Sequence, residues 1–310
     1  MKEPAVDYLV VGAGAMGMAF TDVLVTESDA TVALVDRHHQ PGGHWNVAYP
    51  FVRLHQPSSF YGVNSRPLGE DRIDTAGLNS GLYELASKSE ICAYYDNVMR
   101  DFISSGRVQY FPLCDYRDDG RITSLVSGAC HSVTADKTVD ATYMNVRVPA
   151  MGVPSYQVAG GVRCVPPNAL AGLEAGWENY VVVGAGKTGV DACLFLLENG
   201  ASPDSICWIK PRDSWLWDRA HAQSGDLFEQ SIRPFALGQI IAAAESESVD
   251  DLFDRASAAG LLLRIDDDIR PTMFRCATVT RSEIEQLQRI GNVVRMGRVQ
   301  RIEPGHVILD

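Results

Sequence analysis

The stretch of residues 8–36 constrains the fold most, because it combines a strand, a glycine-rich turn and a helix in one fixed order. An apolar run over residues 8–11 predicts a buried parallel strand, and a helical pattern follows to about residue 27. Between them lie the glycines of a G-x-G-x-x-G turn, Gly12, Gly14 and Gly17. A second β-rich run, residues 30–35, ends on Asp36, which is close to the spacing expected for an acid that binds ribose.

This order predicts a dinucleotide site at the start of the chain. Glycines allow a tight turn and a close approach of the backbone to a pyrophosphate, the helix N-terminus holds the phosphate, and the acid accepts a ribose hydroxyl. The alternative is a glycine turn that only packs a helix on a strand. Strand, turn, helix, second strand and Asp36 all occur together, which favours the nucleotide. Thr21 stands where a smaller residue is common, so we expect a tight helix contact there.

The same unit recurs in the second half of the chain. Residues 180–183 predict a strand, residues 190–198 a helix that ends at Asn199 and Gly200, and residues 205–209 a second strand. The turn between the first strand and the helix carries the second glycine set, Gly184, Gly186 and Gly189. A repeat of the whole unit strengthens both interpretations. It implies two dinucleotides, or two halves of one electron-transfer site.

The second copy differs from the first at the position that reads the ribose. No Asp or Glu lies between Ser205 and Arg212, and the strand continues instead into Lys210 and Arg212. Cationic side chains there accommodate a 2′-phosphate, so the sequence favours NADPH over NADH at the second site. The alternative is that both are solvated charges after a strand.

Composition argues against several classes of function. The 310 residues carry a net charge of −12, which argues against a nucleic-acid partner because phosphate binding depends on clustered Lys and Arg. No apolar run reaches the length of a membrane span and the N-terminus lacks a signal-peptide layout, so we expect a cytoplasmic protein without a membrane partner. The seven cysteines include no C-x-x-C pair, which favours reduced core thiols over disulfides, a redox dithiol or a metal site.

The remaining patterns suggest the domain organisation. Residues 37–77 form a long loop whose aromatic content suggests that a bound cofactor orders it. Residues 89–104 predict an amphipathic helix, and short β-like runs over residues 108–111, 121–126, 131–134 and 138–143 predict a small antiparallel meander. Residues 248–251 and 280–283 match the capping-box pattern that begins a helix, whereas residues 264–273 show no clear period and could form a surface loop. We therefore expect an α/β fold with two Rossmann-like dinucleotide-binding domains, residues 1–165 and 166–292. Residues 293–310 would begin a return to the first domain.

With these motifs the chain resembles the two-dinucleotide-binding flavoproteins, most closely the flavin-containing monooxygenase group. The resemblance rests on the paired glycine turns, on the segment from Gly42 to Trp45, which is similar to the GGxW of that family, and on residues 139–143, which are similar to its ATG strand. It implies FAD at the first site and NADPH at the second. It also implies that Gly43 and Trp45 contribute to the FAD site.

The chain departs from that family at three places. The F-x-G-x-x-x-H pattern before the second nucleotide unit is absent, because residues 156–163 contain no His. Tyr143 stands where the family has glycine. The sequence also stops where such proteins return to the flavin domain, so we expect a fragment of a longer chain rather than an abbreviated flavin domain.

The resemblance implies an FAD-dependent oxidoreductase that is reduced by NADPH and acts, like a monooxygenase, on a small organic substrate. The alternative is a redox sensor or interaction module that binds the cofactors without turnover. His55 and Gln56 are weak catalytic candidates on the loop expected to cover the flavin, and a loop His bonded to backbone is the competing interpretation for His55. An apolar substrate pocket could be lined by Trp215, Trp217, Arg219 and His221, although two Trp at this spacing more often pack in a core.

Overall fold

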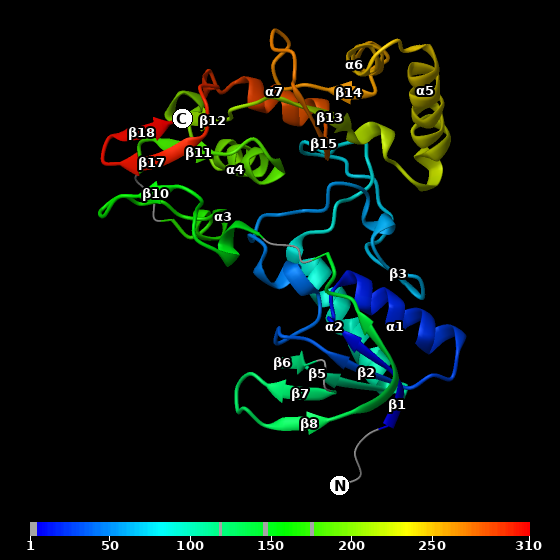
Figure 1. The fold of residues 1–310 in the computed structure, drawn as a ribbon. Helices are drawn as coiled ribbons and strands as arrows, with labels where there is room; N and C mark the ends of the chain where they lie inside the picture. The colour runs from blue at the N-terminus through cyan, green and yellow to red at the C-terminus, as the bar shows by residue number, and fades with distance from the viewer. Residues whose placement is uncertain (1–4, 118–119, 145–147, 174–176) are drawn as a thin grey trace. The chain divides into compact units, whose positions relative to one another are not determined.

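The computed structural model describes residues 5–117, 120–144, 148–173 and 177–310 and divides the chain into two compact units (Figure 1). Unit 1 comprises Met1–Pro50, Ser58–Glu70 and Ala86–Met151. Unit 2 comprises Phe51–Pro57, Asp71–Leu85 and Gly152–Asp310.

Unit 1 is built on a parallel sheet in the order β5-β2-β1-β9. Its strands are β1 (Ala5–Val11), β2 (Val32–Val35), β5 (Val108–Phe111) and β9 (Thr134–Asp140). All four residues of β2 are buried, as a central parallel strand with both faces covered requires. The helices α1 (Ala15–Glu27) and α2 (Lys88–Ser104) lie on one face (Figure 1). Ser87 and Glu90 form a capping box, and α2 begins one residue before the predicted start at residue 89.

A small antiparallel sheet of β6 (Cys114–Arg117), β7 (Arg121–Ser124) and β8 (Cys130–Ser132) packs against the other face of the unit 1 sheet. The shared core contains Leu9, Val35 and Ile122. The predicted meander is therefore present, but its composition differs from the expectation. The first run, residues 108–111, forms β5, and the last run overlaps the end of β9, so both belong to the parallel sheet. The strand β6 was not predicted and completes the meander.

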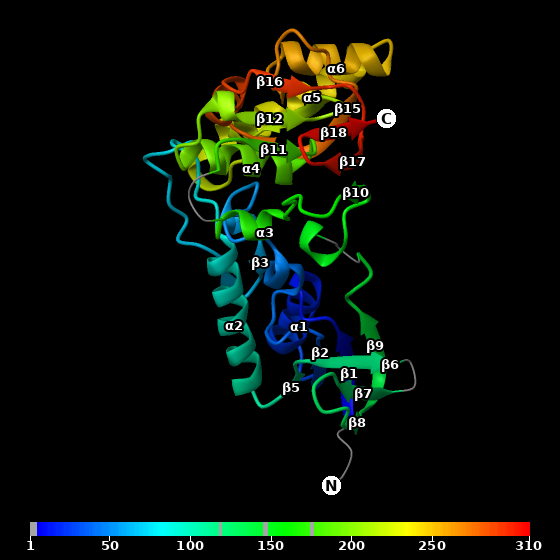
Figure 2. The same ribbon diagram turned by 90° about the vertical axis from the view of Figure 1, so that its left-hand side faces the viewer.

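Unit 2 contains a second parallel sheet in the order β11-β12-β16, formed by β11 (Tyr180–Val183), β12 (Ile206–Ile209) and β16 (Asn292–Val294) (Figure 2). The helices α4 (Lys187–Glu198) and α7 (Arg281–Gln288) pack with it around a core that includes Cys193, Trp208 and Leu287. Thr280 and Glu283 form the predicted capping box of α7. Both Rossmann-like sheets and the α/β fold class are thus confirmed.

An inserted layer lies between β12 and α7 in the chain of unit 2. It contains the sheet β14-β13-β15, with β13 (Ser214–Asp218), β14 (Leu262–Leu263) and β15 (Met273–Val279), and the helices α5 (Ile232–Glu245) and α6 (Val249–Ala258). Ser248 caps α6 by accepting a hydrogen bond from the backbone N–H of Asp251, as its sequence predicts. The strand β15 was not predicted, because residues 264–273 show no clear period and conceal where it begins.

The remaining elements are short. A third small sheet of unit 2 joins β10 (Gln157–Val158) to the hairpin of β17 (Val299–Glu303) and β18 (His306–Leu309). The other pieces are β3 (Gly62–Val63), β4 (Arg66–Pro67), α3 (Pro167–Leu170), and the 3₁₀ turns Gly43–Val47, Ser58–Phe60, Pro149–Met151, Pro203–Ser205, Arg219–His221 and Gly225–Gln230. Within the described residues, no helix is long and apolar enough to span a bilayer.

The two units differ from the expected ranges 1–165, 166–292 and 293–310. The chain passes to unit 2 after Met151, and residues 293–310 belong to unit 2 because β16 pairs with β12 and the final hairpin pairs with β10. Two parts of the long loop also belong to unit 2. Phe51 stacks on Phe195 of α4 with ring centroids 4.1 Å apart, and the backbone N–H of Tyr83 donates to the Gln223 side chain at 2.8 Å.

Candidate dinucleotide-binding sites

The glycine turn of unit 1 has no room for side chains. A Cβ atom at Gly17 would lie 1.8 Å from the carbonyl oxygen of Gly12, so only glycine lets α1 pack this closely on β1. Gly12 has a φ of +103°, and a Cβ there would meet Thr142 Cγ2 at 2.9 Å. Thr21, one turn further along α1, is fully buried and its hydroxyl has no hydrogen-bond partner among the described residues. Thr21 thus lies in the interior of unit 1 with a hydroxyl that the described residues leave unsatisfied.

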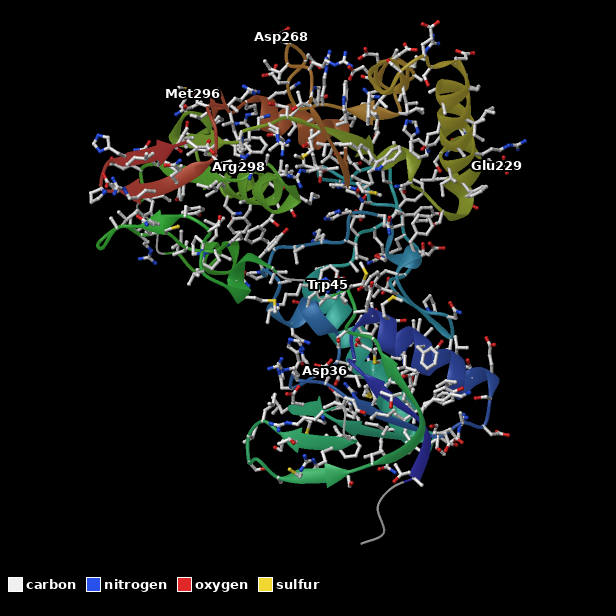
Figure 3. All side chains as sticks on the ribbon, viewed as in Figure 1. Asp36, Trp45, Glu229, Asp268, Met296 and Arg298 are labelled. Atoms are coloured by element: carbon white, nitrogen blue, oxygen red, sulfur yellow. The ribbon has the colours of Figure 1, made fainter. Side chains whose placement is uncertain are left out.

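The segment after β2 rests directly on this turn. The backbone N–H of Gly42 donates to the carbonyl of Ala13 at 2.8 Å. A Cβ at Gly43, whose φ is +55°, would lie 2.9 Å from the Cα of Gly14. The structure thus brings Gly43 to the glycine turn, as expected. Trp45 is buried and donates its indole N–H to the Tyr61 hydroxyl at 2.7 Å, so it belongs to an aromatic cluster beside the turn (Figure 3).

Asp36 lies at the end of β2, where the motif predicts it (Figure 3). Its Oδ2 accepts from the backbone N–H of Ala13 at 2.6 Å, and its Oδ1 accepts from the backbone N–H of His38 at 2.7 Å and pairs with His38 Nδ1 at 2.8 Å. The hydrogen bond to Asp36 raises the pKa of His38. Each carboxylate oxygen has two lone pairs, so Oδ2 retains one acceptor position for a ribose hydroxyl.

The N-terminus of α1 is open toward a phosphate. Its N-cap is Gly14, which supplies no side-chain hydrogen bond, and the first turn holds no acidic residue. The first backbone N–H groups of a helix have no partner inside the helix, and the macrodipole favours an anion there. The glycine turn, the open N-terminus and the free acceptor of Asp36 together fit the adenosine diphosphate part of a dinucleotide.

The second glycine turn repeats this geometry in unit 2. A Cβ at Gly189 would lie 2.3 Å from the carbonyl oxygen of Gly184, whose φ is +125°. The same carbonyl accepts the indole N–H of Trp208 at 2.8 Å, which fixes the turn against the core. The helix α4 begins after Gly186, again without a side-chain cap or an acid in its first turn.

A cavity of about 300 Å³ lies beside the second turn, with Gly184 and Ala185 in its wall. Three arginines from distant parts of the sequence line it: Arg212 after β12, Arg275 in β15 and Arg298 before β17. The Nε of Arg275 is buried and has no hydrogen-bond partner among the described residues. An unsatisfied buried donor of this kind is costly unless a ligand accepts from it. The cavity therefore suits an anion next to the dinucleotide turn.

The structure places Lys210 differently from the expectation. Lys210 is 1% exposed, and its amine forms a buried ion pair with Asp213, which also accepts from Arg295 at 2.7 Å. Burial lowers the pKa of Lys210, while Asp213 opposes that shift. Lys210 does not line the cavity, because its side chain turns into the core of unit 2 to pair with Asp213. Of the two predicted cations, only Arg212 reaches the cavity.

The weak catalytic candidates His55 and Gln56 lie in the part of the loop that belongs to unit 2. The backbone carbonyl of His55 accepts from Arg219 Nε at 2.9 Å and from the Thr278 hydroxyl. Burial lowers the pKa of the His55 ring to about 4, and the positive charge of Lys187 acts in the same direction. The ring is therefore neutral near pH 7. Gln56 is exposed.

The four residues suggested for a substrate pocket have separate roles. Trp215 is a buried core residue, whereas Trp217 lines an apolar cavity. Arg219 is 1% exposed and forms an ion pair with Glu283 at 2.9 Å, so it is a structural residue. His221 pairs with the carbonyl of Gly260 at 3.0 Å.

The comparisons with known proteins agree with this geometry. Residues 10–49 match the family model for an NAD(P)-binding Rossmann-like domain. A solved cyclohexanone monooxygenase from Rhodococcus sp. Phi1 bound to NADP⁺ superposes with a TM-score of 0.54 at 14% identity, over 99% of this chain and 68% of that chain. The structure of OTEMO in complex with FAD and NADP gives a TM-score of 0.53 at 16% identity, over 99% of this chain and 69% of that chain. The chain has the fold of a flavin monooxygenase.

Among curated proteins, an uncharacterised protein of Mycobacterium tuberculosis is 56% identical over 306 residues, which are 98% of this chain. The match covers 57% of that relative, so the chain spans little more than half of its length. An uncharacterised protein of Mycobacterium bovis matches to the same extent. The chain belongs to the same family as these uncharacterised relatives.

Proposed function

We propose that this chain is the cofactor-binding part of an FAD-dependent oxidoreductase that is reduced by NADPH and oxidises a small organic substrate, as a monooxygenase does. The observation that carries the proposal is the pairing of two glycine turns with open helix N-termini and an arginine-lined cavity beside the second turn. Two structural neighbours support it, since OTEMO was solved in complex with FAD and NADP, and the Rhodococcus cyclohexanone monooxygenase was solved with NADP⁺.

In this proposal unit 1 holds FAD. The N–H groups at the start of α1 bind its pyrophosphate, the glycines at positions 12, 14 and 17 let the phosphates approach, and Oδ2 of Asp36 accepts a ribose hydroxyl. Gly43 holds the following segment against the turn. Bound FAD would supply the redox chemistry, accepting a hydride from NADPH and passing electrons to oxygen or another acceptor.

Unit 2 binds the reductant. The start of α4 holds the NADPH pyrophosphate, and the three arginines of the cavity supply positive charge for the 2′-phosphate. Arginine suits this role because its planar fork binds phosphate oxygens through two parallel hydrogen bonds. The selectivity for NADPH thus rests on Arg212, Arg275 and Arg298, with Lys210 acting on the fold rather than on the nucleotide.

The test uses the purified protein loaded with FAD and kept free of oxygen. Visible absorbance is followed while NADPH or NADH is added, and oxygen with candidate organic substrates is admitted afterwards. Bleaching of the flavin band by NADPH at least tenfold faster than by NADH, followed by substrate-dependent NADPH consumption, supports the proposal. Binding of both cofactors without any reduction would instead support the sensor or interaction module, and failure to bind FAD would refute both.

A further inference from the structure

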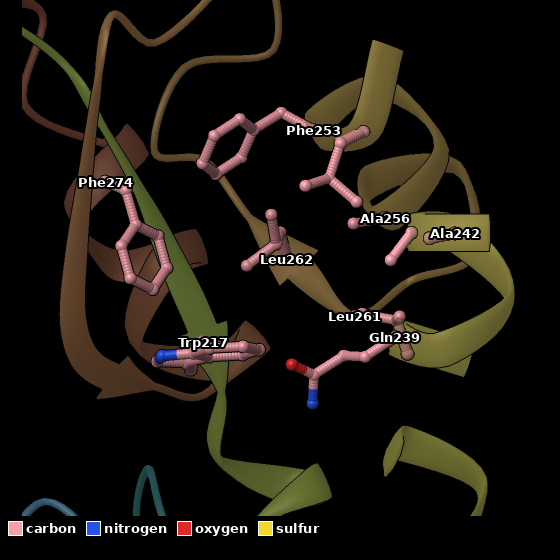
Figure 4. A pocket seen from close by; sticks show the side chains of 10 residues that line it. Trp217, Gln239, Ala242, Phe253, Ala256, Leu261, Leu262 and Phe274 are labelled. Atoms are coloured by element: carbon pink, nitrogen blue, oxygen red, sulfur yellow. The ribbon is translucent and has the colours of Figure 1, made fainter. Parts of the chain in front are cut away.

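Unit 2 contains a second cavity, of about 230 Å³, between the sheet of β13, β14 and β15 and the helices α5 and α6 (Figure 4). It shares no lining residue with the arginine cavity described above. Two helices form one wall of the cavity. The helix α5 contributes residues 239, 242 and 243, and α6 contributes residues 252, 253 and 256; in each case the spacing places the residues on one face of the helix.

Aromatic rings define the shape of this apolar cavity. Trp217 and Phe274 meet edge to face, with ring centroids 5.4 Å apart and an interplanar angle of 87°. Phe253 lies 5.9 Å from Phe274 at 45°. Figure 4 shows Phe253, Phe274 and Trp217 arranged around Leu262, which lies between Phe253 and Trp217 in this view. Rings held at such angles offer both faces and edges to another ring, which is the arrangement that aromatic pairs prefer.

Apart from the indole N–H of Trp217, Gln239 carries the only polar side-chain atoms among the residues that line the cavity. Figure 4 shows its amide directed into the open space toward Trp217. Within the part of the chain that the structure describes, its side chain has no hydrogen-bond partner. One amide in an otherwise apolar wall provides a single donor and acceptor pair that can orient a ligand.

The volume limits the size of the ligand. A cavity of about 150 Å³ accommodates benzene, and drug-sized ligands use roughly 300 Å³ or more. A cavity of about 230 Å³ therefore holds one ring with a small substituent. We propose that this cavity is a binding site for a small single-ring molecule that carries one hydroxyl or carbonyl group, with the ring against Trp217 and Phe274 and the polar group on Gln239.

The proposal is tested with 4-fluorophenol and 4-fluorotoluene, whose ¹⁹F relaxation reports binding to the intact chain. Both contain one ring, and only the phenol can hydrogen-bond to the amide. We expect 4-fluorophenol to bind with a dissociation constant of about 1 mM or lower, which is ordinary for a ligand of this size. Gln239→Leu should weaken the phenol about fivefold to tenfold and leave 4-fluorotoluene unchanged, as the loss of one hydrogen bond predicts.

A matched pair of variants locates the site. Ala243 lies exposed in the cavity wall on α5, so Ala243→Phe should block the opening without disturbing the core and should abolish binding of both probes. Ala244 is the next residue of the same helix, is exposed and does not line the cavity, so Ala244→Phe should bind both probes like the wild type. Equal binding by the two variants, or no binding of either probe to the wild type at 5 mM, overturns the proposal.

Discussion

The pKa of His55 provides a sharp test of how the loop segment Phe51–Pro57 docks within unit 2. The ordinary pKa of a histidine is about 6.5, and burial lowers that of His55 to about 4. The neutral ring is therefore the form that the folded state accommodates. Its stabilising contribution is complete above pH 6.5 and is lost as the pH falls toward 4, because the unfolded chain binds the proton first.

The magnitude follows from the two pKa values. The difference between 6.5 and about 4 corresponds to a loss of about 3 kcal/mol in the free energy of unfolding below pH 4, and about 2 kcal/mol is already lost at pH 5. His55→Gln removes this titration and no other. Between pH 7.5 and pH 5, the free energy of unfolding of the wild type should therefore fall by about 2 kcal/mol more than that of the variant.

The assay is urea unfolding followed by tryptophan fluorescence. Four of the five tryptophans, at positions 177, 208, 215 and 217, lie in unit 2, so the signal reports mainly on the unit that contains His55. The control is His306→Gln, since His306 is exposed on β18 of the same unit. Parallel curves of stability against pH for the wild type and His55→Gln would show that the ring is solvated and that the docking described here is incorrect.

Four further outcomes are expected. Gly17→Ala should abolish retention of FAD, because the added Cβ would overlap the Gly12 carbonyl. The control is Gly291→Ala, whose added Cβ meets nothing within 4 Å and which should retain the wild-type absorbance spectrum. Arg275→Met should weaken NADPH binding at least tenfold by calorimetry and change NADH binding less than threefold, since a charged hydrogen bond to the 2′-phosphate is lost only with NADPH. Lys210→Met should leave the ratio of NADPH to NADH affinities unchanged but destabilise unit 2 by about 3 kcal/mol in urea, because Asp213 loses a buried partner. Thr21→Val should raise the free energy of unfolding of unit 1 by about 1 kcal/mol, measured by circular dichroism, because a buried hydroxyl without a partner is replaced by a methyl group.

Local patterns predicted both nucleotide units well. The glycine spacing encodes its own geometry, since the contacts of Gly17 with Gly12 and of Gly189 with Gly184 span only five residues. Helix caps are equally local, which explains why the starts of α6 and α7 agree with the structure. These are cases in which a few neighbouring residues determine the conformation.

The sequence could not reveal contacts made across long separations. Arg275 and Arg298 come to the second glycine turn only through the pairing of β15 with β13 and the course of the chain before β17. The sequence pattern that indicated a binding site for the 2′-phosphate was a cation directly after a strand, and Lys210 and Arg212 fit this pattern equally well. What separates these two residues is the position of Asp213, which draws the Lys210 amine into the core. Alternation in β15, where Arg275 follows an apolar residue, was a weak signal of a strand with two different faces.

The strand β15 separates the arginine cavity from the apolar cavity, because its successive side chains point to opposite sides. Met273 and Arg275 line the arginine cavity, while Phe274 lines the apolar cavity. A ligand that displaces Phe274 therefore acts on the same backbone that positions Arg275. If an apolar ligand changes the affinity for the dinucleotide by some factor, the dinucleotide must change the affinity for that ligand by the same factor. This reciprocity is a thermodynamic requirement for two coupled binding sites.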